Sequence, residues 1–294
     1  MAGSIFSFRF LSYLVYAVIL TAILLYVRFP TEKFRIYCEQ RLEQVLGKGK
    51  CTIAKIRYHF PASVELRKVE LGQAADSKGN KIVFDWLRLS PGSKGFLTSW
   101  AVTGELYGGS LGALIEVKMK EKAFHLKSIK IEKVDIAAIV AHMPSFQREI
   151  VGELTVSGDY KAKIGQPMSG SGDGNLHIKG GNVQFARQVL TLDAMDFEKL
   201  NIVWKYGDTI FTITEGKMVG QQLNADFTGT LQAPFLPPEG GLNVSGSLVA
   251  KKQFLKDKPQ IERLMQRLMK QYKKSAVPFR LGGTLNKPTF RLSS

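Results

Sequence analysis

The sequence predicts a mainly β (α+β) protein, in which an N-terminal transmembrane helix precedes a curved antiparallel β-sheet domain with short helices. Three observations predict it. An uncharged apolar stretch lies near the N-terminus, most of the chain after residue 50 alternates apolar and polar residues, and Gly, Pro, Asn or Ser separates the alternating stretches. An antiparallel sheet built from such stretches has one apolar face and one solvated face.

Composition limits the class of protein and of partner. The chain has 294 residues, of which 45% are hydrophobic and 22% charged, as in folded proteins. Lys and Arg total 41 against 25 Asp and Glu, which gives a formal net charge of +16. This excess favours an anionic partner: phospholipid headgroups, nucleic acid or an acidic protein surface.

Residues 10–27, FLSYLVYAVILTAILLYV, are predicted to form the transmembrane helix, after a short cytoplasmic segment over residues 1–9. The stretch carries no charge and would span about 27 Å as a helix, close to the thickness of a bilayer core. A cleaved signal peptide is the alternative, but YVRFP follows where a small-residue cleavage site would stand. Arg28, Lys33 and Arg35 follow the span, so flanking charge alone would place the next domain in the cytoplasm.

Residues 28–50 are predicted to form a juxtamembrane helix that leads into the folded domain. Thr31 can cap it, and Phe34, Cys38 and Leu42 recur at helical spacing. Two glycines end it.

Residues 51–294 are predicted to form the β-rich domain. A motif of Gly, one residue and an apolar residue opens several alternating stretches at irregular spacing, so we expect a meander of similar strands with glycines at the bends. DIAAIVAHMPSF, residues 135–146, is a short helical interval. The ending VPFRLGGTLNKPTFRL, residues 277–292, reads as a last pair of strands that closes the sheet.

An inserted basic amphipathic helix is predicted at about residues 252–274. Between residues 251 and 274 the chain has nine Lys or Arg and two acids, with apolar residues on one helical face. The favoured interpretation is a helix that covers the end of the sheet while its charges are solvated. The alternative is contact with an anionic membrane or a partner, made by the basic side chains Arg263, Arg267, Lys270, Lys273 and Lys274.

Three patterns suggest chemistry, and each has a simpler explanation. The sequence around Ser110 fits Gly-x-Ser-x-Gly, but a strand follows in place of the helix that a nucleophile elbow requires, so we expect a hairpin bend. SGSGDGN, residues 169–175, precedes a strand and is predicted to be a turn, not a phosphate loop. No metal-ligand spacing joins the histidines, which are His59, His125, His142 and His177. The sequence therefore predicts no enzyme, cofactor or metal site.

Cys38 and Cys51 leave two alternatives open. In an oxidising compartment they could pair as a disulfide that closes a loop of about fourteen residues. They could equally be two independent buried thiols, because the geometry that a disulfide requires cannot be read from spacing.

The layout of the whole chain resembles the type II secretion system protein N (GspN) family. The features that carry the likeness are the apolar span, the TEKFRIYCEQRLEQVLG helix, the opening strands CTIAKIRYHFPASVELRKVEL and the ending VPFRLGGTLNKPTFRL. The ending is also similar to AsmA-like envelope proteins, through positions that are apolar, glycine or proline: Phe279, Leu281, Gly283, Leu285, Pro288 and Leu292.

This resemblance implies a non-enzymatic protein of the bacterial inner membrane with one transmembrane helix and its β domain in the periplasm. Its function would be that of an accessory component of type II secretion. Its partners would be other secretion-system or envelope proteins, without nucleic acid. The AsmA-like features imply an alternative, a lipid-binding or lipid-transfer protein that holds phospholipid on the apolar side of a curved sheet.

Overall fold

The computed structural model describes residues 3–27, 30–46, 49–59, 62–73, 80–93, 98–143, 149–189, 192–232, 240–257, 259–272, 276–284 and 287–292. The helices are α1 (Gly3–Val27), α2 (Thr31–Leu46), α3 (Ile136–Ala141), α4 (Lys252–Asp257) and α5 (Pro259–Tyr272). The first seven strands are β1 (Gly49–His59), β2 (Ser63–Gln73), β3 (Lys81–Pro91), β4 (Ser99–Leu106), β5 (Gly109–Lys118), β6 (Ala123–Asp135) and β7 (Ile150–Lys163). The other seven are β8 (Gln166–Val189), β9 (Leu192–Gly207), β10 (Ile210–Gly220), β11 (Leu223–Gln232), β12 (Leu242–Ala250), β13 (Val277–Gly283) and β14 (Pro288–Leu292).

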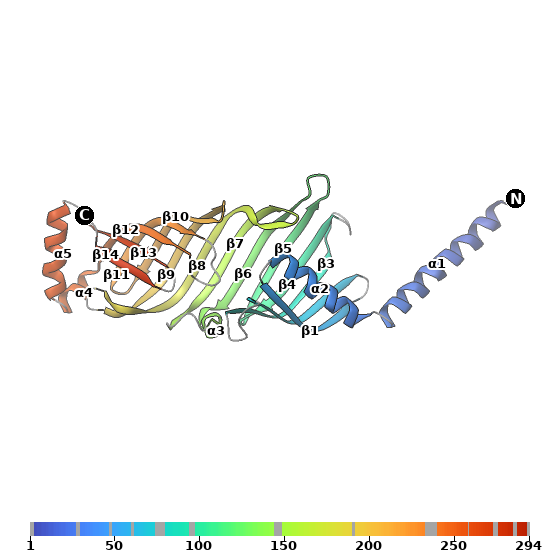
Figure 1. Cartoon of the computed structure of the whole chain (residues 1–294), viewed down its shortest axis with the longest axis horizontal. Coiled ribbons are helices and arrows are strands. Elements are labelled where there is room, and N and C mark those ends of the chain that lie inside the picture. The colour runs from blue at the N-terminus through green and yellow to red at the C-terminus, as the bar shows by residue number, and fades with distance from the viewer. Residues whose placement is uncertain are drawn as a thin grey trace.

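The alternating stretches pair in the order in which the chain presents them. All fourteen named strands form one antiparallel sheet in the order β1 to β14. The sheet is long and curved, with α1 at one end and α5 at the other (Figure 1). The predicted mainly β fold and the meander are confirmed, and so is the final strand pair, which is β13 and β14.

The expected transmembrane helix over residues 10–27 is not supported. Those residues lie within α1, but no helix in the described part of the chain is both long and apolar enough to cross a membrane. Of residues 28–50, expected to form a juxtamembrane helix, Thr31–Leu46 form α2 and Gly49 already belongs to β1.

Two other predictions need correction. The inserted helix expected over residues 252–274 is two helices, α4 and α5, because Pro259 lacks a backbone N–H and begins a new helix. Residues 169–175, predicted to be a turn, lie inside the 24-residue strand β8. Their glycines lie on one face of a continuous strand and do not form a bend.

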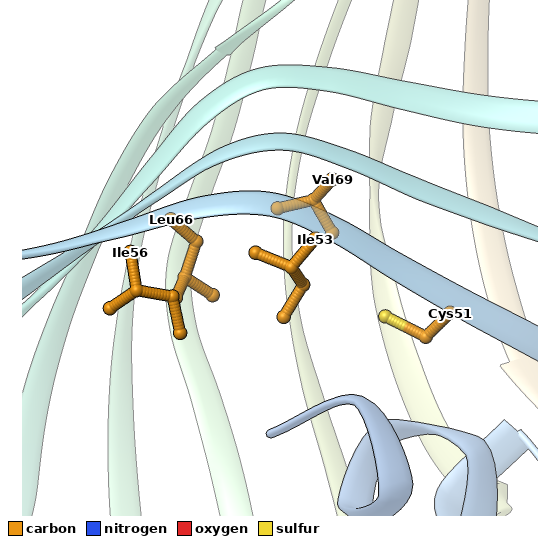
Figure 2. Close-up of a cluster of buried hydrophobic side chains, with 5 residues drawn as sticks. All are labelled: Cys51, Ile53, Ile56, Leu66 and Val69. Atoms are coloured by element: carbon orange, nitrogen blue, oxygen red, sulfur yellow. The ribbon is translucent and has the colours of Figure 1, made fainter. Parts of the chain in front are cut away.

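Helices cover the ends of the sheet. Side chains from β1 and β2 point together toward α2 (Figure 2), namely those of Cys51, Ile53, Ile56, Leu66 and Val69. Phe34, Cys38 and Leu42 of α2 pack against this cluster. At the other end, Phe254 of α4 and Met265 of α5 pack against Leu223 and Val277.

Candidate functional site: an apolar face that runs the length of the sheet

One face of the sheet is apolar along a row of residues that crosses every named strand. Each residue in the row is the direct cross-strand partner of the next, so their side chains lie on the same face. The row continues without a polar residue to β14. Its members are Ile56, Leu66, Leu87, Gly104, Leu111, Ile131, Val156, Leu176, Ile202, Gly216, Phe227, Gly246, Phe279 and Leu292.

The opposite face is polar. The row that begins one residue further along β1 passes from β1 to β8 through direct cross-strand partners. Its members are Arg57, Glu65, Arg88, Thr103, Gly112, Lys130, Ser157 and Asn175. From β1 to β8 the sheet therefore separates an apolar side from a polar side.

The apolar face is closed at its ends and open in the middle. Ile56 and Leu66 are buried under α2, and Phe279 is buried near the other end. Between them, Val156, Leu176 and the neighbouring members of the row in β5–β9 are only half-buried. Sheets normally bury such a face against a second layer. Over the middle strands, the described helix that packs on this side is the six-residue α3, which contacts the start of β7 and leaves the rest of the row without a second layer of described helices.

Aromatic side chains line the open part. The rings of Phe124 and Tyr160 lie 6.5 Å apart between centroids, and those of Tyr160 and Tyr206 lie 6.0 Å apart. Trp204 stacks on Phe211 at 5.4 Å. Burial raises the pKa of Tyr160 and of Tyr206, so both phenols stay neutral at physiological pH.

Glycines in β8 make room for these rings. Gly172 is the cross-strand partner of both Tyr160 and Tyr206. A Cβ on Gly174 would lie 2.8 Å from Cζ2 of Trp204, closer than side chains pack. The run SGSGDGN therefore carries glycine at alternate positions so that aromatic rings can lie flat over the strand.

The polar face has a charge cluster near the first strands. The carboxylate of Glu65, only 3% exposed, accepts hydrogen bonds from Arg88 Nη2 and Arg67 Nε, both at 2.6 Å. His59 Nε2 lies 3.2 Å from the same carboxylate. The hydrogen bond from Arg88, followed by that from Arg67, lowers the pKa of Glu65 to about 2. This cluster is on the face away from the apolar row.

The two cysteines lie on either side of the contact between α2 and β1. Cys51 is buried and Cys38 is half-buried in the same apolar cluster, and both are free thiols. Burial, then the charges of Glu39 and Glu43, raises the pKa of Cys51 to about 11. Both cysteines contact the same apolar cluster, and a disulfide between them stays a prediction.

The basic residues of the inserted helix lie at the far end of the sheet. Arg263, Arg267 and Lys270 are exposed on α5, whereas Met265 between them is buried against the sheet end. This matches the favoured interpretation of a covering helix. Lys273 and Lys274 lie outside the described residues. Contact of the exposed charges with a membrane or partner stays a prediction.

The described structure does not group Ser110 and the described histidines into a catalytic or metal site. Ser110 follows the turn of the β4–β5 hairpin, as expected. His142 Nδ1 lies 2.8 Å from the carbonyl oxygen of Ala138, and His177 contacts Asn201. Among the described residues, no three His, Cys, Asp or Glu side chains are grouped so that they could hold a metal ion.

Comparison with known proteins gives no relative. A scan against protein-family models, a search of curated proteins and a search of solved structures each found no match for this chain. The resemblance to the GspN family and to AsmA-like proteins therefore stays a prediction.

Sequence reasoning missed the aromatic lining and its glycine strand. The signal was present, because Gly170, Gly172 and Gly174 alternate with polar residues at the period of a strand. Alternating glycines on one face indicate a close approach by something from the neighbouring strands, whereas a turn needs its glycines at adjacent or special positions.

Proposed function

We propose that this protein binds lipid, with acyl chains lying along the apolar face of its curved sheet. The observation that carries the proposal is the unbroken row of apolar residues and glycines across all fourteen named strands. An apolar face of this extent is rare on a protein surface unless something binds to it. This is the AsmA-like alternative considered from the sequence.

The ligand class follows from the shape and chemistry of the face. It is long, continuous and free of charge along the row, which suits a linear hydrocarbon chain better than a compact polar metabolite. Tyr160, Tyr206 and Trp204 give it broad aromatic surfaces that pack against methylene groups without fixed geometry. A charged lipid headgroup would remain at the open side, in water.

A pair of neighbouring substitutions tests the proposal. Leu176 belongs to the apolar row, and Asn175 is its neighbour on the polar face. We expect L176K to reduce the phospholipid that co-purifies with the full chain about tenfold, because an ammonium group on the row must stay hydrated. N175K should leave it unchanged. Native mass spectrometry with lipid extraction measures both, after circular dichroism shows that each variant is folded.

Either of two results would refute lipid binding on this face. One is a wild-type chain, purified from its own envelope, that carries no phospholipid. The other is a folded L176K variant that retains as much lipid as N175K.

The location proposed with this function is the bacterial inner membrane, with α1 as the anchor and the sheet in the periplasm. The ground for this location is the sequence, in which residues 10–27 carry no charge, whereas no described helix is long and apolar enough to cross a membrane. Alkaline phosphatase fused to the C-terminus should be active, since that enzyme matures only where disulfides form. An inactive but stable fusion would place the sheet on the other side of the membrane.

A second candidate is the accessory role in type II secretion, favoured by the last strand. β14 ends the sheet, and no described strand pairs with its outer edge. Open edges accept a strand from a partner. A photocrosslinker at Arg291 of β14 should then capture a secretion subunit, whereas one at Arg57 of β1 should not. Equal or absent capture at the two positions would contradict this role.

A further inference from the structure

Two turns at one rim of the sheet are joined to each other. In a meander, every second turn falls on the same rim, and this places the β5–β6 turn beside the β7–β8 turn. The backbone N–H of Ile164 donates to the carbonyl oxygen of Lys122 at 2.7 Å and links the two. In Figure 1 both turns lie at the upper rim, where the β5–β6 turn projects beyond its neighbours.

The tips of these turns expose large apolar side chains. Met119 is 71% exposed and Ile164 is 53% exposed. Both lie at the ends of hairpins and outside the buried clusters of the sheet. Exposed apolar side chains at a projecting tip carry a cost in water that contact with another surface would remove.

Lysines surround the two apolar side chains. Lys118, Lys120 and Lys122 are exposed in or beside the first turn, and Lys163 is exposed beside the second. Glu121 is the one acid among residues 118–122 and 163–165, and it pairs with Lys118 at 3.2 Å. We call this surface the lysine rim, defined by Lys118, Met119, Lys120, Lys122, Lys163 and Ile164.

We propose that the lysine rim docks on an anionic phospholipid bilayer, with Met119 and Ile164 inserted among the lipids and the lysines on the headgroups. Apolar tips surrounded by Lys are complementary to a surface that is apolar inside and negatively charged outside. An acidic protein would satisfy the lysines, but it would need a shaped pocket for each of two protruding tips. The inference goes beyond the proposed function, since docking requires no lipid on the apolar face.

Brominated lipids test the inference, because bromine quenches tryptophan that enters the bilayer. The full chain carrying M119W is reconstituted into phosphatidylcholine vesicles made with or without phosphatidylglycerol. The phosphatidylcholine is brominated in both kinds of vesicle. We expect about a twofold loss of the added fluorescence in the vesicles that contain phosphatidylglycerol and little loss in those that lack it. Replacing Lys118, Lys120, Lys122 and Lys163 by Gln should abolish the difference.

A matched control separates insertion from mere proximity. Q221W places tryptophan at the β10–β11 turn, which lies on the opposite rim of the same sheet. It should not be quenched in either vesicle. Quenching of M119W that is absent, equal in both vesicles or equal to that of Q221W would overturn the inference. Because lipid bound on the apolar face is not measured, failure of this test leaves the proposed function standing.

Discussion

Glu65 is a carboxylate held almost out of water by basic side chains on the polar face. Its pKa, about 2, lies below the ordinary value of 4.5 because Arg88 and Arg67 donate to the ionised form. A group with a lowered pKa in the folded state stabilises the fold at pH values above the ordinary pKa. That contribution is lost as the pH falls from about 4.5 toward 2.

We expect E65Q to lower the free energy of unfolding at neutral pH by about 1–2 kcal/mol. The shift in pKa corresponds to at most about 3 kcal/mol, and solvent around the half-exposed arginines reduces it. The variant should also lose most of the dependence of stability on pH between about 4.5 and 2. Urea denaturation followed across this range measures both effects. A wild-type chain with flat stability there would show that the ion cluster contributes nothing.

The helix α2 protects the first edge of the sheet. The backbone N–H of Ile53 donates to Glu39 Oε1 at 2.8 Å, and that of Cys51 donates to Glu43 Oε1 at 3.2 Å. Two carboxylates one helical turn apart thus satisfy donors that an edge strand leaves unpaired. At the other end, Leu292 of β14 packs against the cluster of Phe254 of α4 and Met265 of α5, which is a contact between side chains.

E39A should destabilise the protein by about 1–3 kcal/mol, because it leaves the N–H of Ile53 without an acceptor in a partly buried place. E32A is the matched control. Glu32 pairs with the same Arg35 but is 77% exposed, so its loss should cost less than about 0.5 kcal/mol. Chemical denaturation measures the free energy of unfolding of both variants. Similar losses for the two would mean that the contact with the edge of β1 is unimportant.

The whole molecule is stabilised by separate apolar clusters spread along the sheet. The cluster under α2 and the cluster at α4 and α5 share no residue and lie at opposite ends (Figure 1). Contacts between strands are between neighbours in the chain. Chains organised in this way resemble repeat proteins, in which one end can open while the other stays folded.

We expect I53A, which removes a side chain from the cluster under α2, to cost about 2–5 kcal/mol locally. Hydrogen exchange should accelerate in β1–β3 and stay unchanged in β11–β13. T52A, on the polar side of the same strand, should change neither region. Faster exchange throughout the sheet would instead indicate a single cooperative unit.

The sequence by itself determined most of the strands and their meander order, although residues 169–175 of β8 were predicted to be a turn. Alternation of apolar and polar residues indicates strands. The short Gly-containing breaks between them are long enough for antiparallel hairpins but too short for the crossover that parallel strands require. The last strand pair, the helix with Asp135 at its N-cap and the hairpin before Ser110 were therefore predictable. The inserted helix was predictable as a cover for the sheet, but the sequence prediction treated it as one helix and missed the break before Pro259.

Only the tertiary structure decided what the sheet presents. The alignment of all fourteen strands depends on how each strand pairs with the next, including bulges such as those between β6 and β7. A shift of one residue in any pair would move apolar side chains to the opposite face. That register produces the unbroken apolar row and the aromatic rings over Gly172 and Gly174. It also brings Ile164 to the β5–β6 turn, where its N–H donates to the carbonyl oxygen of Lys122. Periodicity describes each strand alone, whereas a face or a rim exists only when neighbouring strands are aligned.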